Sequence, residues 1–185
     1  MEPRTQLSTM LSKTCSKKDI LFVANAIVAN PALANELWHT VVARQPHAWR
    51  AAWALYTASE ADAAITSPFL GQIALLLPTA SGNGLIRELL KVLLLHPLPQ
   101  EPSGKLLDFC LHAAASRTFP VSIRMYAMEM AAKYCHRYPE LTREVVILLR
   151  DVAQEAPSVG TKKWACRLAE KLADSSAMDD SHCAV

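Results

Sequence analysis

Apolar residues recur along most of this chain at intervals of three and four positions, the spacing of amphipathic helices. No long stretch alternates with period two, so the pattern does not favour strands. The run over 85–95 is apolar almost all round, which predicts a helix in the centre of the fold. The predicted helices lie near residues 16–28, 31–43, 46–57, 65–77, 85–95, 104–116, 120–136, 139–155 and 159–173.

Start and stop signals mark the helix boundaries. Ser16 followed by Asp19 is a capping-box-like start, although the box normally carries Glu or Gln at its fourth place. Asn30-Pro31 ends one helix and begins the next, because Asn caps well and Pro at the first helical position loses no hydrogen bond. Three prolines within 96–103 predict a loop there.

The domain organisation follows from the same pattern. Residues 1–15 are polar with a weak helical pattern and predict a short or frayed helix. Residues 16–173 predict one helical domain. Residues 174–185 have few large apolar groups, so we expect a disordered tail.

A repeated motif organises the helices. Arg50, Arg87 and Arg124 follow one another at intervals of 37 residues, and Lys163 comes 39 later. Each begins the pattern basic-x-x-apolar-x-x-apolar, which we place at the start of the first helix of a helix pair. A period of this length with two helices per unit predicts an α-solenoid, in which each pair covers the open apolar face of the one before it.

The best-formed pair, Pro120 to Leu149, carries a family resemblance. Pro120-Val-Ser-Ile-Arg124-Met-Tyr-Ala127 resembles the Pro-x-x-Val-Arg-x-x-Ala signature of HEAT repeats. With Tyr138-Pro139-Glu140-Leu141 in its turn, the stretch is similar to a group of small bacterial HEAT-like proteins, and their register extends over most of residues 17–173. No Asp precedes the basic position at a fixed offset, as the Asp–Arg ladder of HEAT repeats would require.

The resemblance implies an all-α, right-handed superhelix of HEAT-like repeats, of the armadillo type, with about ten helices in five antiparallel pairs. It implies a fold and no established activity.

Composition narrows the setting. Apolar residues make up 51% of the chain and charged residues 19%, which is a globular balance. The net charge of +2 gives no sign of the basic surface that nucleic acids or anionic membranes attract. The five cysteines are scattered without a CxxC, so we expect reduced thiols and a cytoplasmic protein. The uncharged stretch 63–86 is interrupted by Pro and Gly, and its apolar core is too short to span a bilayer.

Catalytic and metal-binding motifs are missing from the sequence: it has no P-loop, GxGxxG, HExxH or GxSxG. Glu36 and His39 have the Glu-x-x-His spacing of di-iron bundles, which need that motif twice, so we interpret them as a surface pair. Asp108 and His112 offer a metal too few ligands and favour an intrahelical ion pair. Cys135-His136 are adjacent on a helix and diverge by about 100°. We therefore predict no catalytic residue, no cofactor and no metal site.

The candidate partner-binding residues are the four repeated basic residues and two tryptophans near helix ends: Arg50, Arg87, Arg124, Lys163, Trp38 and Trp49. The basic residues either form a ladder that contacts an acidic partner or phosphates, or bond carbonyls and acids of the neighbouring repeat. We favour the second, structural interpretation. Trp53 and Tyr56 share a helical face with Trp49, and we expect both in the core.

The predicted function is a non-catalytic protein–protein interaction or scaffold module that uses the curved solenoid surface. The alternative is a nucleic-acid-binding module, since HEAT-like folds also occur in alkylated-DNA glycosylases; it requires a basic groove and an aromatic–carboxylate pocket. A third possibility is an enzyme whose site is assembled across repeats, with an acid and a His in a deep pocket. The partner and the oligomeric state are not given by the sequence.

Overall fold

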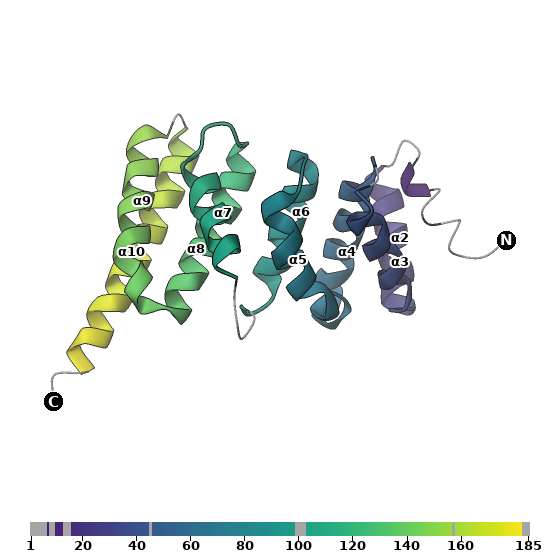
Figure 1. The fold of residues 1–185 in the computed structure, drawn as a ribbon, viewed down its shortest axis with the longest axis horizontal. Coiled ribbons are helices and arrows are strands. Elements are labelled where there is room, and N and C mark those ends of the chain that lie inside the picture. The colour runs from purple at the N-terminus through teal and green to yellow at the C-terminus, as the bar shows by residue number, and fades with distance from the viewer. Residues whose placement is uncertain are drawn as a thin grey trace. The chain divides into compact units, whose positions relative to one another are not determined.

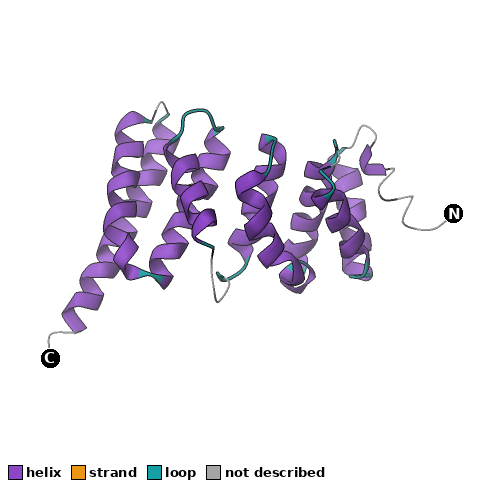
Figure 2. Cartoon of the chain, viewed as in Figure 1, coloured by secondary structure: helices purple, strands orange, loops and turns teal. Residues whose placement is uncertain are grey.

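The computed structural model describes residues 7, 10–12, 16–44, 46–98, 103–156 and 158–182. All secondary structure in these residues is helical, as Figure 2 shows, so the all-α prediction is confirmed. The chain forms two compact units, Met1–Pro99 and Gln100–Val185, where the sequence predicted one continuous helical domain.

The first unit consists of two rows of helices. α4 packs against α2 on one side and α6 on the other, and α3 and α5 lie against α4 and α6 respectively (Figure 1). The α-helices are α2 (Lys17–Ala29), α3 (Leu33–Val42), α4 (Ala48–Ala61), α5 (Leu70–Leu76) and α6 (Asn83–Leu95), and the 3-10 turns are η1 (Ala63–Ile65), η2 (Ser67–Phe69) and η3 (Leu77–Thr79).

α4 is enclosed on three sides, and its sequence shows why this is possible. Its buried positions are mostly alanines, together with one leucine and one serine: Ala48, Ala51, Ala52, Ala54, Leu55, Ala58 and Ser59. Small side chains let neighbouring helices approach closely, because little volume stands between the backbones. The large aromatic side chains of α4 lie outside these closely packed positions, along the edge of its contact with α6.

The single helix predicted over 65–77 is wrong in part. The structure places η1 and η2 before α5 and η3 after it, so the regular helix covers only Leu70–Leu76. Pro68 and Pro78 account for the interruptions, since each lacks an N–H and each stands in the first turn of a 3-10 segment. α6 ends at Leu95 and the next helix begins at Gly104, and residues 96–98 and 103 between them are not helical, as expected for the predicted loop. The rest of that loop, residues 99–102, lies outside the described residues.

The second unit also has two rows. α8 packs against α7 and α10, while α9 packs against α10 and, less extensively, against α8 and α7. The elements are α7 (Gly104–Ala115), α8 (Val121–Arg137), η4 (Pro139–Leu141), α9 (Thr142–Glu155) and α10 (Val159–His182).

The stretch from Pro120 to Leu149 consists, as predicted, of two helices joined by a tight turn: α8 and α9, with η4 as the turn. The pairing of helices differs from the prediction. α8 makes its larger contact with α7, and α9 makes its largest with α10. Arg124 therefore lies near the start of the second helix of a pair, because α8 packs most extensively on α7, the helix before it, and less on α9.

The N-terminal cap of α2 follows the predicted motif. The Ser16 hydroxyl accepts from the Asp19 backbone N–H, and the Asp19 carboxylate accepts from the Ser16 backbone N–H at 2.7 Å. Two hydrogen bonds hold the pKa of the Asp19 carboxyl below its usual value. The larger effect comes from the Ser16 backbone N–H and the smaller from the Ser16 hydroxyl. Asp therefore closes the box in place of the usual Glu.

At the chain ends, Leu7 and Leu11 are helical and buried, and the rest of the predicted first helix lies outside the described residues. α10 continues to His182, so a helical backbone stands where we predicted disorder from residue 174. No Gly or Pro follows Gly160 in this helix, so no strong helix breaker opposes its continuation.

Candidate functional site

An open row of aromatic side chains follows α4. Trp49, Trp53 and Tyr56 are spaced i, i+4 and i+7, which puts them on one helical face, and each is half-buried. The indole rings of Trp49 and Trp53 stack with their centroids 6.2 Å apart and their planes 13° apart. The Tyr56 hydroxyl donates to Glu60 Oε1 at 2.7 Å, which fixes the far end of the row.

α6 lies beside this row and contacts both of its ends. A Cβ atom on Gly84 would stand 3.3 Å from Trp49 Cβ, so the glycine lets the indole lie almost against the α6 backbone. The ammonium of Lys91 lies 3.5 Å from the centroid of the Tyr56 ring. This is a cation–π contact, which holds the lysine against α4.

A buried carboxylate holds the cations of α6 in place. Glu88 is 1% exposed, yet both of its oxygens are bonded. Oε1 accepts from Arg87 Nε at 2.8 Å and lies 2.8 Å from Arg87 Nη2, and Oε2 accepts from Lys91 Nζ at 2.9 Å. A buried carboxylate is costly unless it is paired in this way. The pairing in turn fixes the orientation of the Arg87 guanidinium and the Lys91 ammonium.

We call this surface the aromatic–cation face, and define it as Trp49, Trp53 and Tyr56 of α4 with Arg87 and Lys91 of α6. The Arg87 side chain is 41% exposed and that of Lys91 is 18% exposed. Charged and aromatic groups therefore reach the same open side of the first unit.

A pocket of about 230 Å³ adjoins this face at the Trp49 end. Its walls come from the loop after α3, the start of α4 and the start of α6, and they include Arg44, Trp49 and Gly84. Arg44 has a left-handed backbone (φ 51°), and its Nη2 donates to Thr79 Oγ1 at 3.0 Å. The lining contains no carboxylate and no imidazole, so it lacks the acid and base that an enzyme site across repeats would require.

The predicted basic ladder divides into different environments. Arg50 Nη1 donates to the Leu11 carbonyl at 2.8 Å, and buried Arg124 Nε donates to the Ala114 carbonyl at 3.0 Å. Arg87 pairs with Glu88 and is partly open. Lys163 is exposed on α10. The structural interpretation thus describes Arg50 and Arg124, whereas Arg87 and Lys163 reach the surface.

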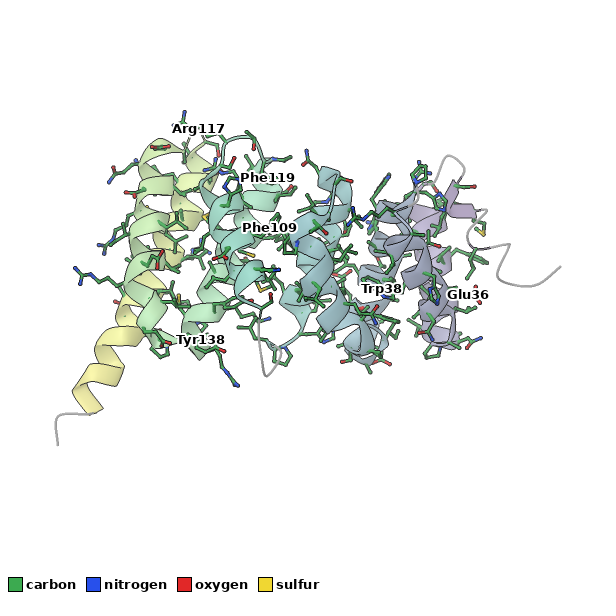
Figure 3. All side chains as sticks on the ribbon, viewed as in Figure 1. Glu36, Trp38, Phe109, Arg117, Phe119 and Tyr138 are labelled. Atoms are coloured by element: carbon green, nitrogen blue, oxygen red, sulfur yellow. The ribbon has the colours of Figure 1, made fainter. Side chains whose placement is uncertain are left out.

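The predicted burial of three aromatic residues, Trp38, Trp53 and Tyr56, differs from the structure. Trp38, a candidate anchor, is 4% exposed; its Nε1 donates to Gln72 Oε1 at 2.6 Å and its ring stacks on Phe69 at 5.3 Å. Figure 3 labels it on α3, within the helices of the first unit. Trp53 and Tyr56, which we expected in the core, are half-buried on the aromatic–cation face. Trp49 is the candidate that lies where a partner can reach it.

The motifs weighed for metal binding gather no ligand set. Within the described ranges, no group of three His, Cys, Asp or Glu side chains lies close enough to hold a metal ion. Asp108 and His112 are both exposed and form no ion pair, contrary to the prediction. The His112 ring instead lies edge-on to Phe119 at 6.2 Å, and Phe119 also packs edge-on against Phe109 (Figure 3).

Burial shifts the pKa values of two cysteines and of the Glu129–Lys133 pair, and it does not make either thiol more reactive. Burial raises the pKa of the Cys135 thiol to about 11 and that of Cys110 further still, so neither forms a thiolate readily. On α8, burial raises the pKa of Glu129 and lowers that of Lys133, and the attraction between the two charges opposes both shifts. No helix in the described part of the chain is both long and apolar enough to cross a membrane.

Sequence reasoning missed Glu88 and Lys91 as part of a site. The available signal was in α4: its alanine-rich positions mark the sides that pack, so the aromatic positions between them mark the side that does not. Lys91 could be assigned to the same site only once α4 and α6 are known to lie side by side, because Lys91 is on α6 and the aromatic row is on α4.

Comparison with known proteins gives one result. A family model described as HEAT repeat domain matches residues 7–172. Searches of curated proteins and of solved structures found no match. The family model covers most of the chain and both of its units, in agreement with the two-row helical packing and the sequence resemblance. The chain belongs to the HEAT repeat domain family.

Proposed function

We propose that this HEAT repeat protein is a non-catalytic, cytoplasmic protein-binding module, and that its binding surface in the first unit is the aromatic–cation face. The observation that carries the proposal is the position of Trp49, Trp53 and Tyr56, three large aromatic side chains that share one helical face and are only partly buried. Isolated exposed apolar residues are common on protein surfaces, but a contiguous group is typical of an interaction site.

The chemistry of the face supports the same conclusion. Trp, Tyr and Arg are the residues that most often dominate binding energy at protein interfaces, and all three occur here. Their orientations are held before binding by the Trp49–Trp53 stack and by the bonds to Glu88. A surface that is already ordered loses less conformational entropy when a partner binds.

Family membership and the wider bacterial resemblance support a module of this kind, since repeat proteins present extended surfaces for partners. The nucleic-acid alternative requires a continuous basic track and free aromatic faces. Here Glu88 pairs with both Arg87 and Lys91, and Lys91 lies over the Tyr56 ring. The catalytic alternative has no acid–base pair in the pocket beside it.

Site-specific photo-crosslinking tests the proposal. A photoreactive residue at Thr57, which is half-buried on α4 next to Tyr56, should give discrete protein adducts in extracts of the source cells. The same residue at Arg143, exposed on α9, is the matched control and should give few. Adducts at Arg143 and none at Thr57 would place binding elsewhere and overturn the proposed surface.

A further inference from the structure

We infer that the partner presents an acidic segment to the aromatic–cation face, with its carboxylates paired to Arg87 and Arg44 and its apolar side chains laid against Trp53. This inference rests on the proposed function and specifies the chemistry of the partner. Its basis is the charge of the face and of the pocket beside it.

The charge census favours an acidic occupant. Three cations belong to the face and the pocket, namely Arg44, Arg87 and Lys91, against two carboxylates, Glu60 and Glu88. Glu88 is buried with both oxygens bonded, so an incoming group does not reach it. The groups that do reach the surface are therefore predominantly cationic.

Arg87 is built to bind a second carboxylate. Its bonds to Glu88 use Nε and Nη2, and Nη1 makes no hydrogen bond to any described residue. A guanidinium carries five N–H donors, which allows it to serve two carboxylates at once. Because Glu88 already fixes the guanidinium plane, a partner carboxylate meets a donor that is already oriented.

The pocket supplies a second cation at the other end of the row. Arg44 and Trp49 both line it, so a side chain that enters beside the indole comes near the guanidinium. A segment that lies along α4 can therefore place one acid near Arg87 and another near Arg44. Apolar side chains between the two acids would cover Trp53.

The aromatic rings are arranged for apolar side chains and not for nucleobases. Trp49 and Trp53 stack on each other, and Trp49 also lies against Gly84. One face of the Tyr56 ring is occupied by Lys91. Single-stranded nucleic acids need free aromatic faces and a continuous basic track, and Glu60 would repel a phosphate at the far end of the row.

Display selection of random peptides on the full-length chain tests the inference. We expect the selected peptides to be enriched in Asp and Glu around an apolar residue. Synthetic versions with each Asp or Glu changed to Asn or Gln should bind more weakly, by up to about fivefold for each carboxylate. This measurement leaves the protein unaltered, so it does not depend on the folding of any variant.

Protein variants then locate the contact. Arg87→Gln and Arg44→Gln should each weaken the selected peptides, Arg87→Lys should retain part of the affinity, and Arg143→Gln on α9 is the matched control that should change nothing. Trp53→Ala leaves the charge of the face unchanged, so weaker peptide binding in this variant shows that the peptides contact the aromatic row.

Each outcome decides the inference. Peptides without acidic enrichment that still lose binding in Trp53→Ala would overturn the acidic segment and leave the proposed surface standing. Selected peptides that are indifferent to both Trp53→Ala and Arg87→Gln would overturn both. A short single-stranded oligonucleotide that displaces the selected peptides and binds more tightly than they do would overturn the inference in favour of nucleic acid.

Discussion

Arg124 offers the sharpest test of how the repeated basic residues act. The side chain is 4% exposed, and its Nε–H donates to the carbonyl of Ala114 at the end of α7. Arg124→Ala removes a hydrogen bond from a charged donor, about 1.5–3 kcal/mol, and leaves the carbonyl without that partner. It also removes two buried methylenes, Cγ and Cδ, since alanine keeps Cβ; their loss costs about 1.6 kcal/mol at about 0.8 kcal/mol for each methylene.

One effect of the substitution opposes this loss of stability. Arg124→Ala also removes a desolvated charge, which offsets part of the cost. We expect a net loss of about 2–4 kcal/mol in the free energy of unfolding, within the range for disrupted buried networks. Lys163→Ala, at the corresponding place in the repeat but exposed, should change it by less than about 0.5 kcal/mol.

Urea denaturation followed by far-ultraviolet circular dichroism measures both variants, and hydrogen exchange of α7 and α8 assigns the change to the second unit. Exchange protection in α7 should fall in Arg124→Ala, because the α7 C-terminus loses its tie to α8. If Arg124→Ala unfolds at the wild-type urea concentration while peptide or protein binding is lost, then Arg124 is a binding residue and the structural interpretation is wrong.

Three further changes test individual features. Glu88→Gln should lower the free energy of unfolding by about 1–3 kcal/mol in urea denaturation, because it leaves Arg87 without a balancing charge; an unchanged midpoint would contradict this. Gly82→Ala, at φ 89°, should cost about 1 kcal/mol by the same assay, whereas Gly71→Ala inside α5 should stabilise. Since burial raises the pKa of Cys135 from 9.0 to about 11, the unfolded chain loses this proton first; Tm should fall between pH 9 and pH 11, and fall less in Cys135→Ala.

The helices could be predicted from the sequence because each of them satisfies a local rule. Ser16 with Asp19 begins α2, and Pro139 opens the turn before α9, since caps and prolines act within one turn of the backbone. The pairing of the helices could not be predicted in this way. α8 and α9 are joined by a tight turn, yet α9 makes its largest contact with α10, and that choice depends on which apolar faces match across the unit.

The basic ladder shows how a correct sequence period can still misplace side chains. Arg50 is the third residue of α4, Arg124 the fourth of α8, and Arg87 and Lys163 are the fifth of their helices. One position along a helix rotates a side chain by about 100°. Arg87 and Lys163, at the fifth position, are the more exposed side chains. Arg124, at the fourth position, is buried, and Arg50, at the third, donates to the Leu11 carbonyl. Nearly equal spacing in sequence, 37, 37 and 39 residues, therefore gave unequal environments, because the helices begin at different points in the period.

The position of the aromatic row follows from the way α4 is packed. A helix with neighbours on three sides accepts small side chains there, so alanines occupy the core positions and the large rings are confined to the open side. Leaving Trp53 and Tyr56 only partly buried forgoes part of the roughly 1.5–3 kcal/mol that full burial of a large side chain contributes. A partner that covers these rings recovers that part on binding, and the cations beside them select which partner does so. The feature that keeps these rings out of the core is thus the same one that makes them available for recognition.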